Sequence, residues 1–247
     1  MAKALNVQNI FASVTRSQVT EDRMNAFEEA LSDPTALAEF RKNAEKTSEF
    51  LQALYGTSER GRKLALSFLS APYAIWGLAG NGQAGAVMAI INASETTHEQ
   101  KMQVLSAPRA IQGLANNDQA KAVMVIITAL ETTHEQKVQM LSVQNAIMGL
   151  ADNGQAEAVM AIINAPETTY EQKVQMLIAP NARGLANNGQ AAAVQQITDS
   201  EAYEQALEAY RAKMAAAQAP SPGAVTPRAP MRRVQQKLID NPEHVKM

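Results

Sequence analysis

The sequence predicts an all-α fold, a right-handed α-solenoid of repeats about 36 residues long with helical caps at both ends. Two observations lead to this prediction. The segments 70–105, 106–141 and 142–177 align with one another without a gap, as is typical of stacked helical units. The chain is also 46% hydrophobic but only 4% aromatic, so its core consists mainly of Ala, Ile, Leu, Val and Met, which favour close helix packing.

The repeat array decays at both ends. A fourth copy begins at Ile178 and lacks one residue before Gly184, and remains of an earlier unit are visible at 47–54 and 63–69. The ends of such arrays commonly differ from the inner units because they close the stack.

Residues 1–56 are expected to form an N-terminal helical cap that contains a degenerate repeat, and 57–198 the solenoid. Apolar residues at helical spacing and helix-start signals predict three helices in the cap, at 20–31, from Asp33-Pro34 onward and at 47–55.

Each unit is expected to contain three short helices. The first begins at a capping box, Thr96-x-x-Glu99, which recurs as Thr132-x-x-Glu135 and Thr168-x-x-Glu171. The second opens at Ser106-Ala-Pro108, with proline in the first turn, and ends near Ala115 at an Asn-Gly or Asn-Asp pair that accepts left-handed backbone angles. The third covers about 83–93 and is apolar nearly all round, which indicates a central position. None of these helices can bury its apolar surface alone, so the units must stack.

The C-terminal part is predicted to close the stack and then leave it. Ser200 can cap a helix within 199–219 whose apolar residues form one stripe: Tyr203, Leu207, Tyr210 and Met214. Residues 220–247 are proline-rich and lack hydrophobic periodicity, so they are expected to be a flexible linker with a basic tail.

Composition argues against several classes of function. There is no cysteine and there are only three histidines, so no thiolate nucleophile, cofactor or metal site is expected. The net charge of −2 does not suit a broad grip on nucleic acid. The apolar runs are shorter than a membrane span, so no membrane partner is expected. No small-molecule substrate is expected either. The chain is assigned to the cytoplasm, or to a host cell if it is secreted.

No convergent set of nucleophile, base and orienting group is visible, so the chain is not expected to be an enzyme. His98 and His134 occupy the same place in successive units, with Tyr170 in the third. They are expected to be solvated residues of the first helical turn, one repeat apart, that do not meet.

Two amide ladders run through the units and have two interpretations. A column of amides can hold an extended peptide backbone, as in armadillo-like proteins. Alternatively, Asn ends the second helix and Gln bonds across the stacking interface, which is the favoured interpretation. The ladders are Asn81, Asn117, Asn153 and Asn188, and Gln83, Gln119, Gln155 and Gln190.

Variable positions within the otherwise constant unit are the candidate binding residues. In the second helix Ala74, Ile75 and Leu78 form the buried side, so the side chains that change between units lie on the opposite face. These are Tyr73, Trp76, Arg109, Gln112, Asn145 and Met148, and the start of the third helix adds Lys121 and Glu157. Stacking is expected to join all eight into one ribbon.

Tyr, Trp, Arg and Met are enriched in protein interfaces, so the ribbon predicts a protein or peptide partner. Two alternatives stay open. The positions could be drifting surface sites, with Tyr73 and Trp76 covered by the N-terminal cap. The chain could also bind nucleic acid through Arg109, Lys121, Arg183 and the tail residues Arg228, Arg232 and Arg233.

Trp76 is expected to be partly exposed. Its counterparts in the next two units are Gln112 and Met148, and a position that accepts glutamine cannot lie deep between repeats. For the same reason Gln112→Ala is expected to cost little stability.

The unit is similar to known helical repeats. Its three-helix length resembles Pumilio repeats, which implies base reading by one helix, although that helix carries Ala84, Ala86 and Val87 here. LANNDQAKAV and LADNGQAEAV resemble the loop and second helix of transcription-activator-like effector repeats, which implies DNA reading by a variable residue pair, although one of those places is always Asn here. Near-identical tandem units beside a proline-rich tail resemble host-directed effectors of intracellular bacteria, which implies a host protein as partner.

Overall fold

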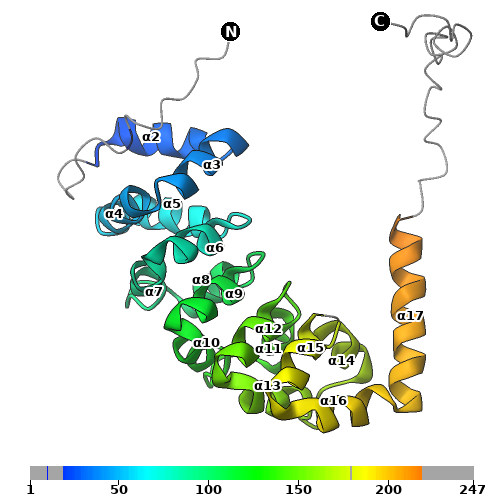
Figure 1. The fold of residues 1–247 in the computed structure, drawn as a ribbon. Coiled ribbons are helices and arrows are strands. Elements are labelled where there is room, and N and C mark those ends of the chain that lie inside the picture. Colours follow the sequence, from blue (N-terminus) through cyan, green and yellow to red (C-terminus); the bar gives the residue numbers. More distant parts are fainter. Residues whose placement is uncertain (1–9, 11–18, 179, 219–247) are drawn as a thin grey trace, which may run out of the picture. The chain divides into compact units, whose positions relative to one another are not determined.

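The computed structural model describes Ile10, 19–178 and 180–218, and every regular element in these ranges is a helix. Helical units that repeat about every 36 residues pack against one another in chain order, as predicted (Figure 1). The chain divides into two compact units, 1–210 and 211–247. The predicted linker and tail at 220–247, including Arg228, Arg232 and Arg233, lie outside the described residues, and the domain boundaries stay predictions.

The N-terminal cap is built around four phenylalanines. The ring of Phe27 lies 5.3 Å from Phe40, 5.1 Å from Phe50 and 5.8 Å from Phe68, centroid to centroid, and all four side chains are fully buried. The first two contacts are edge-on, which suits the aromatic quadrupole. The helices that carry these rings are α2 (Glu21–Ala30), α3 (Pro34–Lys42), α4 (Ala44–Tyr55) and α5 (Glu59–Leu69).

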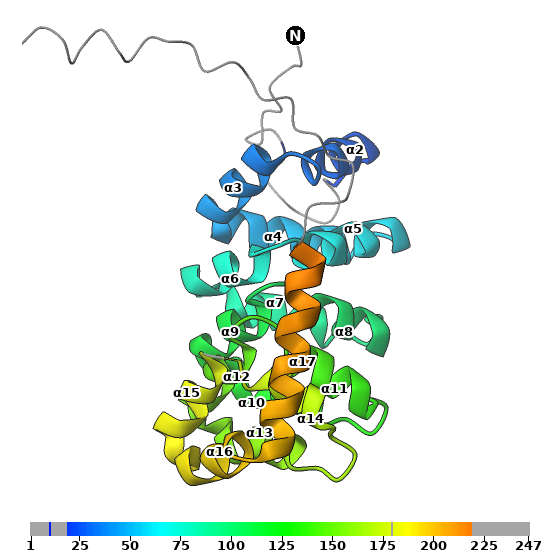
Figure 2. The same cartoon turned by 90° about the vertical axis from the view of Figure 1, so that its right-hand side faces the viewer.

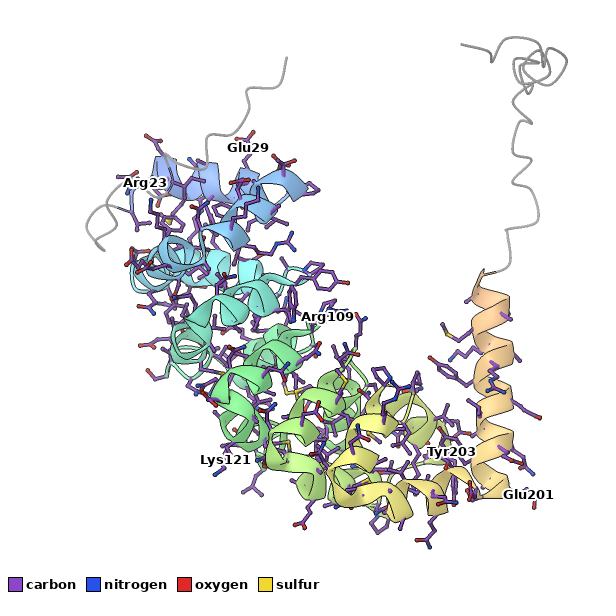
Figure 3. All side chains as sticks on the ribbon, in the orientation of Figure 1. Arg23, Glu29, Arg109, Lys121, Glu201 and Tyr203 are labelled. Atoms are coloured by element: carbon purple, nitrogen blue, oxygen red, sulfur yellow. The ribbon has the colours of Figure 1, made fainter. Side chains whose placement is uncertain are left out.

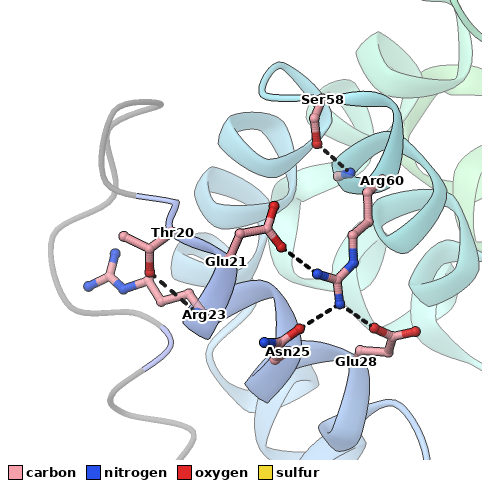
Figure 4. Close-up of polar contacts among 8 residues, drawn as sticks. Thr20, Glu21, Arg23, Asn25, Glu28, Ser58 and Arg60 are labelled. Atoms are coloured by element: carbon pink, nitrogen blue, oxygen red, sulfur yellow. Dashed lines mark hydrogen bonds and ion pairs between the residues drawn. The ribbon is translucent and has the colours of Figure 1, made fainter.

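Polar contacts hold α2 on α5 at the surface of this cap. The Arg60 guanidinium donates hydrogen bonds to Glu21 at 2.5 Å, Asn25 at 2.7 Å and Glu28 at 2.6 Å (Figure 4). The hydrogen bond to Glu28, followed by the contacts with Glu21, raises the pKa of Arg60 above its usual value. The start of α3 agrees with the prediction, since Asp33 accepts a bond from the Thr35 amide at 2.8 Å. Helix α4 begins at Ala44, before the predicted start at 47.

The repeated units place their helices in three columns (Figure 2). The first helices after α5 are α8 (His98–Leu105), α11 (His134–Leu141) and α14 (Tyr170–Met176). The second helices are α6 (Ala74–Leu78), α9 (Ala110–Leu114), α12 (Ala146–Leu150) and α15 (Asn181–Leu185). The third helices are α7 (Ala84–Ile91), α10 (Ala120–Ile127), α13 (Ala156–Ile163) and α16 (Ala191–Thr198).

The first helix of each unit begins one residue later than predicted. The N-cap is Thr97, whose hydroxyl accepts from the Gln100 amide at 3.3 Å while the Gln100 side chain accepts from the Thr97 amide at 2.9 Å. Thr96 is buried instead, and its hydroxyl donates to the carbonyl of Ile90 at 2.7 Å. The run Thr-Thr-His-Glu-Gln contains two overlapping capping boxes, and the structure uses the second because the first threonine is engaged elsewhere.

The second helix also begins later than predicted. Ser106 does not cap it, because the Ser106 amide still donates to the carbonyl of Met102 at 2.9 Å and so completes α8. Helix α9 opens at Ala110, with Arg109 at its N-cap in a left-handed conformation and no side-chain cap.

The end of the second helix agrees with the sequence. The residue after each asparagine is left-handed, with φ of 81° at Gly82 and 64° at Asp118. Asn81 donates to the carbonyl of Gly77 at 2.7 Å, and the other three asparagines repeat this bond four residues back. The asparagine ladder therefore ends helices, as in the favoured interpretation. A role in holding a peptide stays a prediction. Wide five-residue turns follow: η2 (Ala79–Gln83), η3 (Ala115–Gln119), η4 (Ala151–Gln155) and η5 (Ala186–Gln190).

One stretch in the described ranges, Ala74–Ile91, has the length and mean hydropathy, 1.3 over 18 residues, of a possible membrane span. Its backbone breaks at Asn81 and Gly82, where η2 separates α6 from α7. More than half of it, 56%, is buried within the fold. These properties are those of a core segment, because apolar side chains here already contact other helices.

The third helices were predicted to be central, but each has one buried and one exposed face, and Val125 in α10 is 69% exposed. The buried face makes a prediction about stability. Ile126 in α10 is buried, whereas Leu130 in the loop after it is 103% exposed. Ile126→Ala should lower the free energy of unfolding by about 2 to 5 kcal/mol because it leaves a cavity between helices. Leu130→Ala, a similar truncation in the same unit, should change it by less than about 0.5 kcal/mol. Urea unfolding measures both, and equal losses would contradict this assignment of buried and exposed sides.

The predicted C-terminal helix forms, but only its first turns are covered. Helix α17 (Glu201–Gln218) begins after Ser200, whose hydroxyl accepts from the Tyr203 amide at 3.3 Å. Tyr203 and Ala206 are buried, whereas Met214 is 42% exposed and 211–217 are exposed throughout.

Candidate interaction surface

The second helices form one edge of the stack through close backbone contact. A Cβ added to Gly113 would lie 2.7 Å from Cα of Trp76, one added to Gly149 would lie 2.8 Å from Cα of Gln112, and one added to Gly184 would lie 2.7 Å from Cα of Met148. Only glycine allows this approach. The main chain of each variable residue therefore packs on the next unit.

The residue before each second helix has an unusual backbone. Tyr73, Arg109 and Asn145 are N-caps with φ of 63°, 61° and 61°. Asparagine tolerates this left-handed conformation, but a residue with a bulky side chain loses roughly 1 kcal/mol or more in it. Strain of this kind is concentrated at functional sites in proteins. Two of the predicted binding residues thus occupy a position that an asparagine would fill with less strain.

Three predicted residues meet at this edge. The guanidinium carbon of Arg109 lies 5.8 Å from the ring centroid of Tyr73 and 5.6 Å from that of Trp76. Both distances are within the range of cation–π attraction. Tyr73 is 38% exposed and Trp76 43%, which confirms that Trp76 is partly exposed. Figure 3 shows Arg109 projecting from the edge of the stack. We call Tyr73, Trp76 and Arg109 the aromatic–arginine cluster.

The next rung of the edge is polar. Asn145 donates from its side-chain amide to the Gln112 side-chain carbonyl at 3.1 Å, and the Met148 amide donates to the Asn181 side-chain carbonyl at 3.4 Å. Gln112 is only 9% exposed, so its assignment to the surface was wrong. Glutamine is accepted between units because the following unit supplies a hydrogen-bond partner. The loss expected for Gln112→Ala rises accordingly to about 1 kcal/mol.

The predicted ribbon does not contain all eight residues on one edge. Lys121 and Glu157 are exposed at equivalent positions of α10 and α13. Figure 3 shows Lys121 and Arg109 on different sides of the stack. The turns η3 and η4 lie between the second and third helices. After these turns the exposed side of the third helix differs from that of the second helix, and alignment of the repeats alone does not show this change. The binding role of each residue stays a prediction.

The histidines link neighbouring units and are not freely solvated. Nε2 of His98 lies 3.1 Å from the Thr132 hydroxyl, and Nε2 of His134 lies 3.0 Å from the Thr168 hydroxyl. Each threonine donates its proton to an isoleucine carbonyl, so each histidine must donate from Nε2. Tyr55 bonds to Thr96 in the same way at 2.5 Å. The signal for this contact in the sequence was the first threonine of each Thr-Thr pair, which was predicted to cap a helix instead.

Tyr170 occupies the place of the histidines in the third unit and makes a different contact. The Lys173 ammonium lies 4.9 Å from its ring centroid. In the described ranges no group of three or more His, Asp or Glu side chains could hold a metal ion.

Comparison with known proteins found no matching family model, no matching curated protein and no matching solved structure, so no family is assigned.

Proposed function

We propose that this chain is a non-enzymatic scaffold that binds a protein or peptide along the edge formed by α6, α9, α12 and α15. The observation that carries the proposal is the aromatic–arginine cluster, which joins side chains of two units on a partly exposed surface. Trp, Tyr and Arg are the residues most enriched in binding hot spots. The proposal includes a right-handed solenoid for the array, and a cytoplasmic location or, for a secreted effector, a host cell.

The backbone supports the same edge. A left-handed Tyr73 and Arg109 destabilise the free protein relative to asparagine at these positions. Partly exposed Trp76 adds apolar surface that a partner could cover. Both costs occur where Tyr73, Trp76 and Arg109 meet.

The experiment selects peptides from a random library on the full chain and measures their affinity by fluorescence anisotropy. Trp76→Ala should weaken binding roughly 30-fold or more, as for a hot-spot aromatic residue. Lys121→Ala, on another side of the stack, should leave the affinity unchanged. An equal loss for both variants, or no loss for either, would place binding elsewhere.

Nucleic-acid binding is the competing function, and exposed Arg183 on α15 together with Arg109 favours it. Its affinity should fall steeply between low and physiological salt because phosphate contacts release counterions. A peptide held mainly by aromatic contacts should show a much weaker dependence. Titration with a single-stranded oligonucleotide at several salt concentrations separates the two functions.

A further inference from the structure

We infer that the partner is an acidic peptide and that one of its carboxylates binds the guanidinium of Arg109. This inference rests on the proposed function and adds the chemistry of the partner. Its starting observation is that Arg109 is oriented by two rings, at 5.8 and 5.6 Å, and not by hydrogen bonds. Two ring contacts can hold the guanidinium in place while its terminal N–H groups stay available to a ligand.

The hydrogen-bonding capacity of Arg109 is unused in the described part of the chain. Its Nε is buried and has no hydrogen-bond acceptor. Among the ion pairs formed by described residues, none includes Arg109. A carboxylate cannot reach the buried Nε, but it can accept from the two terminal nitrogens of the guanidinium, which also gives bidentate geometry.

The charge of the edge is complementary to a carboxylate. The second helices with their N-caps cover 73–78, 109–114, 145–150 and 180–185, and these segments contain Arg109 and Arg183 but no Asp or Glu. No acidic side chain of the edge therefore competes for Arg109. Two arginines are too few for the many phosphate contacts that hold nucleic acid, so a peptide fits this edge better than a polyanion.

The neighbours of Arg109 define the rest of the ligand. Trp76 offers a partly exposed ring on one side of Arg109. Met148, the counterpart of Trp76 two units further along, is half-buried. Between them the Gln112 and Asn145 side chains bond to each other across 3.1 Å. The edge thus fits an extended peptide segment in which apolar residues flank one acidic residue. The apolar residues would contact Trp76 and Met148, and the acidic residue would accept the charge-assisted hydrogen bonds of Arg109.

The test uses the peptides selected on the full chain. Each is synthesised again with every Asp and Glu replaced by Asn and Gln, and both versions are titrated against the native protein, Trp76→Ala, Arg109→Gln and Arg109→Lys. The acidic version should bind the native protein about 10- to 100-fold more tightly than the amide version. Arg109→Gln should remove this difference. Arg109→Lys should restore only part of it, because an ammonium lacks the bidentate fork. Equal thermal melts would show that these variants fold alike.

The outcomes separate the two proposals. Peptides that depend on Trp76 but bind equally well as acids and amides would overturn the acidic partner and leave the proposed function intact. Peptides that are indifferent to both Trp76 and Arg109 would overturn both. A single-stranded oligonucleotide that competes with the peptide for the edge, with a steep salt dependence, would overturn both in favour of nucleic acid.

Discussion

Gly149→Ala should lower the free energy of unfolding by about 3 kcal/mol or more, the upper end of the range for an overpacked site. The new Cβ would lie 2.8 Å from Cα of Gln112, and both atoms belong to main chains that cannot rotate away. The second helices of the two units would have to separate. Because stacked units are stabilised largely by their contacts with neighbours, a weakened contact should also divide one unfolding transition into two.

Gly85→Ala is the matched control for this substitution. Gly85 lies in α7, and a Cβ added there would have no atom of another residue within 4 Å, so a methyl group would be accommodated. This change should raise stability by roughly 0.5 to 1 kcal/mol, since alanine is the better helix former. Urea unfolding followed by circular dichroism measures both variants. A loss at Gly85 as large as that at Gly149 would mean that the close approach of the second helices is not what requires glycine.

Phe27→Ala should cost about 3 to 5 kcal/mol because it empties the centre of the N-terminal cap. The Phe27 ring contacts all three other phenylalanines of that cluster and is fully buried. The polar contacts of Arg60 with α2 cannot replace it, since they are exposed and screened by water. Amide hydrogen exchange should then become fast in α2 while α10 keeps its protection.

Arg60→Gln provides the comparison for the cap. It removes the charge that bonds to Glu21 and Glu28 but leaves the phenylalanines in place, so its effect should be much smaller. If Arg60→Gln released α2 as completely as Phe27→Ala, the cap would be held by its surface ion pairs, contrary to this interpretation.

Much of the fold could be predicted because repetition removes ambiguity. Period and helix order follow from aligned copies and hydrophobic spacing. Helix starts were less certain, because the run Thr-Thr-His-Glu-Gln offers two overlapping caps, and only packing shows that Thr96 bonds to Ile90. Local signals do not contain that tertiary contact.

The candidate site was predictable in part for a related reason. Variation between copies identified Tyr73, Trp76 and Arg109, and the structure brings these three together. It also led to Gln112 being placed on the surface, because burial of an amide depends on a partner one unit away, Asn145. The constant glycine of AIWGL, AIQGL and AIMGL was the signal that could have revealed the close contact of the second helices.

The contact at Gly113 involves Cα of Trp76 and leaves the indole ring outside the joint between units. Copies with Trp, Gln or Met at this register share one main-chain geometry, although Trp76 is 43% exposed and Gln112 only 9%. At Trp76 the main chain takes part in assembly while the indole ring stays available to a partner.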